Sequence, residues 1–217
     1  RPRRRTLGIE VHPDLSVVVL APFDCADDLI QLRVRRRARW ISRQLERFQR
    51  YVPKTPPRRY VAGETHLYLG RQYRLKVVRG EYEGVRATRL DLIVTVRGRM
   101  GSERIEQLVK AWYLRQAKQI LASVLKESFG TFARRGYAIP RIGVRAMARR
   151  WGSLSPAGTM TLNVDLVRAP KPCIEYVVAH ELCHLVHKHH GSAFFRFLGQ
   201  VMPEWERRKQ RLENALL

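Results

Sequence analysis

Cysteine is scarce in the sequence, and the few cysteines present do not form a recognisable framework. They are Cys25, Cys173 and Cys183, so their number is odd and no C-x-x-C spacing occurs. This usage excludes a network of disulfides and a zinc site built from cysteine pairs. It is typical of a reducing compartment, and we therefore expect a cytoplasmic protein. We expect Cys183 to be a small buried side chain rather than a metal ligand.

Long apolar stretches are also missing. No run approaches the roughly 18 apolar residues of a membrane-spanning helix, so we expect no membrane span. The basic start, Arg1–Arg5, precedes an apolar run, Val17–Phe23, that is too short for a secretion signal. With 45% hydrophobic residues among 217, the chain still has enough apolar side chains for a core, in one or two domains.

Acidic residues are few as well. The chain has 19 Asp and Glu against 42 Lys and Arg, which gives a formal net charge of +23. Such a charge favours polyanionic partners, namely nucleic acid or nucleotides bound through a basic surface. Arginine outnumbers lysine, a bias that genomic base composition also produces, so both explanations stay open. There is no P-loop for phosphate binding and no internal repeat.

Histidine, in contrast, is concentrated in one stretch. Five of the seven histidines lie between residues 180 and 190, and His180, Glu181 and His184 form an H-E-x-x-H motif. Neither Gly nor Pro interrupts residues 173–188, which predicts a helix. Residues four apart share a helix face, so the two imidazoles can hold one metal ion while Glu181 reaches a water molecule. This arrangement is typical of zincins, with one Zn²⁺ per chain and the glutamate as general base.

A catalytic zinc site usually has a third protein ligand. We favour His190, which lies ten residues after His180 and can return to the site only if the helix ends near Lys188. Gly191 and Ser192 supply a plausible break. The competing candidates are His187, His189 and Glu204, and the last of these would give a His-His-Glu site.

The remaining pattern predicts an α+β fold. We expect an antiparallel β-rich N-terminal region with one basic helix, residues 1–98, followed by a zincin-like domain of helices and strands, residues 99–217. In the N-terminal region we expect a β-hairpin within 7–23, a helix over 26–50 and antiparallel strands within 61–96. The helix has a basic face, Arg33–Arg39, and is ended by Pro53–Pro57. In the second domain we expect a helix over 103–129 capped by Ser102, strands over 142–147 and 159–164, the motif helix, and helices over 194–202 and 206–216.

Together with the motif, residues along nearly the whole chain resemble the YgjP-like metallopeptidase family, which is related to the SprT-like and WLM metallopeptidases. The residues that carry the resemblance are Gly63-Glu64, Leu69-Gly70-x-x-Tyr73-x-Leu75, Trp112-Tyr113, Arg150-Trp-Gly-Ser153, Leu162-Asn163, Ala169-Pro170, Tyr176 to His184, His190-x-x-x-Phe194 and Met202-Pro203-x-Trp205. The resemblance implies His180, His184 and His190 as ligands and Glu181 as the catalytic residue. The chain departs from the family at Leu154, where Cys is usual, and at His189, where Asn is frequent.

Three functions are compatible with these observations. The first is a zinc-dependent metallohydrolase that cuts peptides or proteins. In this function Arg150 and Asn163 orient the substrate, and Tyr176 donates a hydrogen bond to the oxyanion of the tetrahedral intermediate. The second, which has been proposed within the family, is a metal-dependent nucleoside triphosphate pyrophosphatase. The third is a nucleic-acid-binding module with structural zinc, although a structural site has no need of a base at Glu181.

Overall fold

The computed structural model describes residues 7–11, 15–49, 58–148 and 150–216. The chain forms two compact units, Arg1–Pro56 and Pro57–Leu216. Their mixture of helices and strands confirms the α+β class. Residues 58–98, which we expected in a separate N-terminal region, have their contacts in the larger unit. A functional division after residue 98 stays a prediction.

The smaller unit is a hairpin with one helix. Strands β1 (Gly8–Val11) and β2 (Val17–Leu20) pair antiparallel, as expected, and their turn at 12–14 lies outside the described residues. Helix α1 (Asp27–Gln49) matches the expected basic helix, whereas the Pro53–Pro57 stop is not among the described residues. Among the described residues of this unit, only Ile41 is buried, and it keeps 9% of its surface exposed. None of the helices in the described ranges is long and apolar enough to cross a membrane.

The larger unit begins with a four-stranded sheet of order β3-β4-β6-β5. Its strands are β3 (Thr65–Tyr68), β4 (Arg71–Arg79), β5 (Gly84–Ala87) and β6 (Asp91–Val96). The expectation of a purely antiparallel sheet is wrong, because β4 and β6 are parallel. Strand β6 buries three side chains and occupies a central position, so the less buried β5 lies at the edge. Glycine turns mark where strands end, but they do not determine which strands pair.

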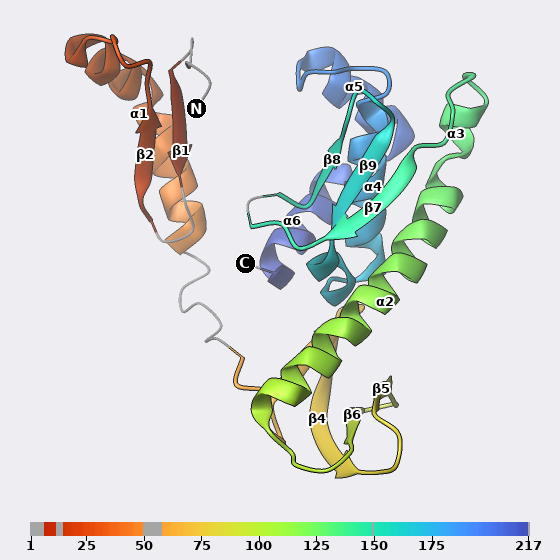
Figure 1. Cartoon of the computed structure of the whole chain (residues 1–217). Coiled ribbons are helices and arrows are strands. Elements are labelled where there is room, and N and C mark those ends of the chain that lie inside the picture. Colours follow the sequence, from red (N-terminus) through yellow and green to blue (C-terminus); the bar gives the residue numbers. More distant parts are fainter. Residues whose placement is uncertain (1–6, 12–14, 50–57, 149, 217) are drawn as a thin grey trace. The chain divides into compact units, whose positions relative to one another are not determined.

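Helix α2 (Ser102–Ser128) follows and connects two parts of the unit. It contacts β5 and β6 near one end and strand β7 (Arg141–Arg145) near the other, as Figure 1 shows in green. The expected cap at Ser102 is wrong. Gly101 is the extended residue before the helix, Ser102 is already helical, and no side chain caps this end. A short helix, α3 (Gly130–Ala133), completes the turn into β7.

A three-stranded sheet and three helices complete the unit. The sheet order is β7-β9-β8, in which β8 (Gly152–Leu154) and β9 (Thr159–Asn163) are antiparallel and β7 and β9 are parallel. Neither β8 nor the 3₁₀ helix η1 (Val164–Arg168) was among the elements predicted from the sequence. The helices are α4 (Lys171–Cys183), α5 (Ser192–Val201) and α6 (Trp205–Leu216).

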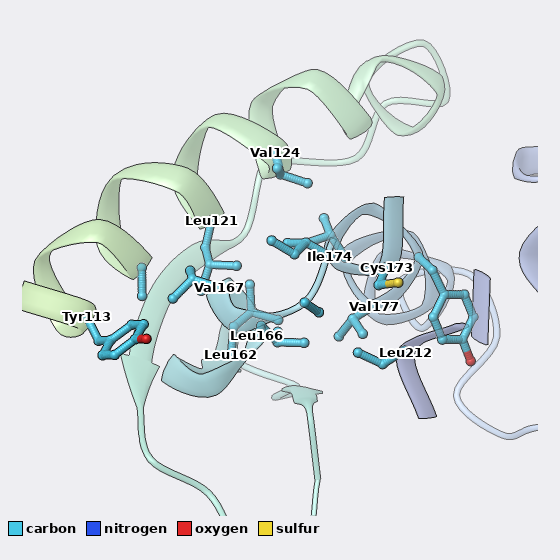
Figure 2. Close-up of a cluster of buried hydrophobic side chains, with 14 of the residues drawn as sticks. Tyr113, Leu121, Val124, Leu162, Leu166, Val167, Cys173, Ile174, Val177 and Leu212 are labelled. Atoms are coloured by element: carbon cyan, nitrogen blue, oxygen red, sulfur yellow. The ribbon is translucent and has the colours of Figure 1, made fainter. Parts of the chain in front are cut away.

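The core joins these elements around α4. Figure 2 shows buried side chains of α2, β9, η1, α4 and α6 gathered in one cluster. The four-stranded sheet is tied to the same core, since the Tyr113 hydroxyl of α2 donates a hydrogen bond to the Leu67 carbonyl oxygen at 2.6 Å. Gly70, at φ +77°, lies against Pro170, where a Cβ would approach the proline Cγ to 2.6 Å. The turn after β3 therefore fixes the start of α4.

Candidate metal and catalytic site

The site is built on α4, a helix that is buried on most of its faces. Pro170 precedes it and Pro172 lies in its first turn, where a missing N–H costs nothing. The apolar residues then pack against α2 and α6. The helix ends at Cys183 with His184 as C-cap, five residues before the expected end at Lys188. After Cys183 the chain continues in a turn, in which Leu185 and Val186 still pack against the core while Lys188, His189 and His190 are exposed.

Three histidines meet at this helix end. One nitrogen each of His180, His184 and His190 lies within 4.8 Å of the others. His190 Nε2 is 2.8 Å from His180 Nε2, because the chain turns back after the early end of the helix. The competing candidates His187, His189 and Glu204 are not in the cluster, and Glu204 pairs instead with Arg208 at 3.1 Å. The geometry therefore brings together the favoured set, and its role as a ligand set stays a prediction.

Neighbouring groups fix the orientation of the three rings. His184 Nδ1 is 3.0 Å from the His187 carbonyl oxygen, which can accept its proton and leave Nε2 with a free lone pair. Phe194 of α5 is fully buried, and its ring centroid lies 4.7 to 4.9 Å from all three imidazole centroids. His180 Nδ1 is buried without a hydrogen-bond partner among the described residues. The Phe194 ring thus packs against all three imidazoles.

The surroundings of His180 and His190 favour their neutral forms. Burial, followed by the charges of His190 and His184, lowers the pKa of His180 to about 3. Burial is also the first cause of the lowered pKa of His190. Lys209 acts on both rings in the same direction. A neutral imidazole is the form that binds a metal ion, so the electrostatics suit the cluster to that task.

Glu181 is held beside the cluster by strand β8. Its side chain is 7% exposed, and burial raises its pKa to about 7, against the opposing effects of Arg150 and a backbone hydrogen bond with Leu154. Gly152 leaves the space for it, since a Cβ there would lie 2.7 Å from Glu181 Cγ and 2.8 Å from Oε1. The absence of a side chain at residue 152 therefore sets the position of the carboxylate.

A cleft of about 720 Å³ lies over these groups. Its walls are the segment Arg150–Gly158 on one side and residues of α4 on the other, and His184 and His190 also line it. Among the described residues that line the cleft, Glu181 is the only carboxylate, whereas Arg150 and Lys188 bring positive charge. The cleft can therefore hold a substrate next to one base and several cationic or neutral nitrogen groups.

The three predicted substrate residues have different surroundings. Arg150 lines the cleft and acts electrostatically on Glu181. Tyr176 also lines it, with its ring against His180 and stacked on Trp205. Asn163 is 3% exposed and does not line the cleft.

Asn163 is instead bonded to the backbone. Its amide nitrogen donates to the carbonyl oxygens of Met147 and Arg150, and its oxygen accepts from the Asp165 N–H. These bonds hold the segment that leads into β8. The arrangement supports a positioning role for Asn163 rather than contact with substrate.

Two residues that contact the candidate site, Gly152 and Phe194, were not recognised from the sequence as parts of it. Gly152 and Phe194 belonged to the family markers, but their tasks depend on contacts across the fold. The only local signal in the sequence was the spacing of four residues between His190 and Phe194. Such a spacing near the start of a helix can bring two side chains close together.

Nearly the whole chain matches one family model, described as YgjP-like, metallopeptidase domain, over residues 5–215. Among solved structures, the chain is similar to the metallopeptidase zymogen abylysin of Pyrococcus abyssi, with 22% identity and a TM-score of 0.40 over 44% of this chain and 94% of that chain. The jannalysin zymogen of Methanocaldococcus jannaschii gives 21% identity and a TM-score of 0.37, over 46% and 90%. No curated protein matches the sequence.

Proposed function

Because the chain belongs to the YgjP-like family of metallopeptidase domains, we propose that it is a zinc-dependent peptidase with Glu181 as its general base. The family membership confirms the resemblance noted from the sequence. The observation that carries the proposal is the meeting of three imidazoles and one buried carboxylate in a single cleft. Each half of this arrangement has a separate task.

His180, His184 and His190 would hold the metal ion. Their nitrogen atoms are close enough to share one ion, and nitrogen donors with a vacant fourth position suit Zn²⁺. The carbonyl oxygen of His187 supports this use, since it can fix the tautomer of His184. When bound, zinc supplies a Lewis acid that polarises the scissile carbonyl group.

Glu181 would carry the proton during hydrolysis. In its ionised form it accepts one proton from the attacking water while the water oxygen bonds to the carbonyl carbon. It then gives this proton to the amide nitrogen as the C–N bond breaks, so that the products are a carboxylic acid and an amine. Gly152 supports this role because it lets the carboxylate lie next to the cleft without a clash.

Strand β8 would bind the substrate backbone. Trp151 accepts a hydrogen bond from the Asn163 N–H, and the Ser155 N–H donates to the Thr159 carbonyl oxygen, so these residues face β9. Alternation along a strand turns the backbone groups of Gly152 and Leu154 the other way. Both residues line the cleft. Because the Leu154 N–H already donates to Glu181, an extended peptide would pair with the backbone of Gly152 and with the Leu154 carbonyl oxygen. The positive charges of Arg150 and Lys188 favour acidic side chains in that peptide.

The two other functions differ from this proposal in measurable ways. The cationic lining also suits a nucleoside triphosphate, so pyrophosphatase activity is the alternative with a specific observation in its favour. A structural zinc site would not require the ionisable side chain of Glu181. Both alternatives can be tested with one pair of variants.

The test is Glu181→Gln, with Glu175→Gln as the matched control on the same helix. Glu175 pairs with Arg208 and does not line the cleft, so we expect Glu175→Gln to leave turnover intact. We expect Glu181→Gln to keep its zinc content and its melting temperature and to lose about 100-fold or more in turnover of unfolded protein. Nucleoside triphosphates are assayed in parallel.

Three results would contradict the proposal. If Glu181→Gln loses its zinc together with its stability, the carboxylate has a structural task. If wild-type protein with a full complement of zinc cleaves triphosphates but no peptide bond, the site belongs to the alternative function. Normal turnover of peptides by Glu181→Gln would exclude this residue as the base.

A further inference from the structure

The smaller unit has a charged helix that the proposed peptidase activity does not use. Between residues 33 and 43, α1 has six exposed arginines and no acidic residue: Arg33, Arg35, Arg36, Arg37, Arg39 and Arg43. None of them forms an ion pair with a carboxylate of the described residues. Asp27 and Asp28 lie at the start of the helix and Glu46 near its end, so the positive charge between them is not neutralised.

A small cavity lies beside this run of arginines. It has a volume of about 250 Å³ and is lined by Leu7, Ile9, Arg33, Arg37 and Trp40. Arg33, Arg37 and Trp40 are spaced by four and three residues, so they lie on one face of α1. Leu7 and Ile9 come from the hairpin region, which forms the apolar wall. The cavity thus combines an aromatic ring, an apolar wall and two guanidinium groups.

We propose that this cavity is a binding site for single-stranded nucleic acid. One base enters the cavity and stacks on Trp40, while the flanking phosphates contact Arg33 and Arg37. Aromatic stacking together with cationic groups that follow the backbone is the chemistry by which proteins hold single strands. The remaining arginines of α1 extend the phosphate contacts along the helix.

The size and composition of the cavity favour this ligand over others. A cavity of about 250 Å³ is below the usual range of about 300–1,000 Å³ for small-molecule pockets, but it has room for one flat ring. A duplex keeps its bases stacked and offers phosphates and base edges, but no base face that could stack on Trp40. A membrane surface would use the arginines without needing a recessed aromatic slot. A single strand uses both the arginines, which contact its phosphates, and the cavity beside Trp40, which accepts a base.

The test uses the full chain and a fluorescein-labelled single strand of about 12 nucleotides, within the site sizes of known single-strand binders. Arg33→Gln/Arg37→Gln removes two phosphate contacts, and Arg115→Gln/Lys118→Gln on α2 removes the same charge from exposed positions. We expect at least tenfold weaker binding for the first pair and less than twofold for the control. The slope of log affinity against log salt should fall by about 1.4 for the first pair only.

Trp40 gives an independent readout. We expect Trp40→Ala to weaken binding about tenfold without changing the salt slope, whereas Trp40→Phe keeps most of the affinity. Should Trp40→Ala fail to fold, the exposed arginine pair and Trp40→Phe still decide the question.

Four results would overturn the proposal. They are equal affinities of the two double variants, an unchanged salt slope for Arg33→Gln/Arg37→Gln, equal binding of a duplex of the same length, and capture by anionic phospholipid vesicles without binding of the oligonucleotide. Each of them would show that the cavity does not hold a base.

Discussion

The position of Glu181 depends on a glycine, and this dependence gives the sharpest prediction. In Gly152→Ala, the new Cβ would lie 2.7 Å from Glu181 Cγ and 3.0 Å from Cδ. Non-bonded carbon atoms are most favourable at about 3.5–4.0 Å. The carboxylate must therefore move by about 1 Å, or strand β8 must move by the same amount.

A displacement of this size affects turnover more than stability. Misplacement of a catalytic group by about 1 Å can cost about 100-fold in rate. The strain is smaller, about 1 kcal/mol, because a glutamate side chain can rotate away. We therefore expect kcat to fall about 100-fold, while KM, zinc content and melting temperature change little.

The matched control is Gly143→Ala on β7 of the same sheet. Its Cβ would meet Thr161 Oγ1 at 3.5 Å, an ordinary contact, so we expect turnover near that of the wild type. The assay measures peptide hydrolysis and zinc content of both variants. Wild-type kcat in Gly152→Ala would refute the reasoning, as would an equal loss of kcat in both glycine variants.

Two further predictions concern charge and pH. Charge reversal by Arg150→Glu should lower the preference of the cleft for acidic over basic peptides about tenfold in kcat/KM, whereas Lys118→Glu should leave this ratio unchanged. Burial, followed by Arg58, lowers the pKa of His66 below 6.5, and the opposing effect of Glu64 at 3.3 Å does not outweigh it. Folding therefore favours the neutral ring, and the unfolded chain binds more protons below pH 6.5, so His66→Gln should lose less stability than the wild type on acidification. Urea midpoints at pH 7.5 and 5.5 would measure this difference, and parallel losses would contradict it.

The sequence predicted those features that depend on local pattern. Apolar periodicity located α1, α2 and the α4 helix, and the i, i+4 spacing placed His180 and His184 on one face. It did not predict strand pairing, because the choice of β6 over β5 for the centre of the sheet depends on total burial. Nor did it predict where α4 ends, since residues 184–188 contain neither Gly nor Pro, and Leu185 and Val186 still pack against the core in the turn that follows the helix.

In the candidate site, too, local patterns were predictable from the sequence and contacts across the fold were not. The motif identified the histidines and Glu181 because their chemistry is visible in the residue types. Strand β8 has only three residues, too few for alternation to appear, so the role of Gly152 became apparent only from its distance to Glu181. The backbone hydrogen bonds of Asn163 could not be predicted from its residue type for a similar reason. A polar side chain near a cleft can satisfy backbone groups as readily as a substrate.

The helix shared by the two sheets has a thermodynamic consequence. Because α2 packs against β5 and β6 as well as against α4, the four-stranded sheet cannot separate without exposing part of the core that supports the histidines. The larger unit is therefore expected to open as one cooperative block. Any ion that binds only its folded form protects the distant sheet by the same free energy as the site itself. Conversely, a substitution that destabilises strand β6 lowers the fraction of molecules with an ion bound at His180, although β6 does not contact this residue.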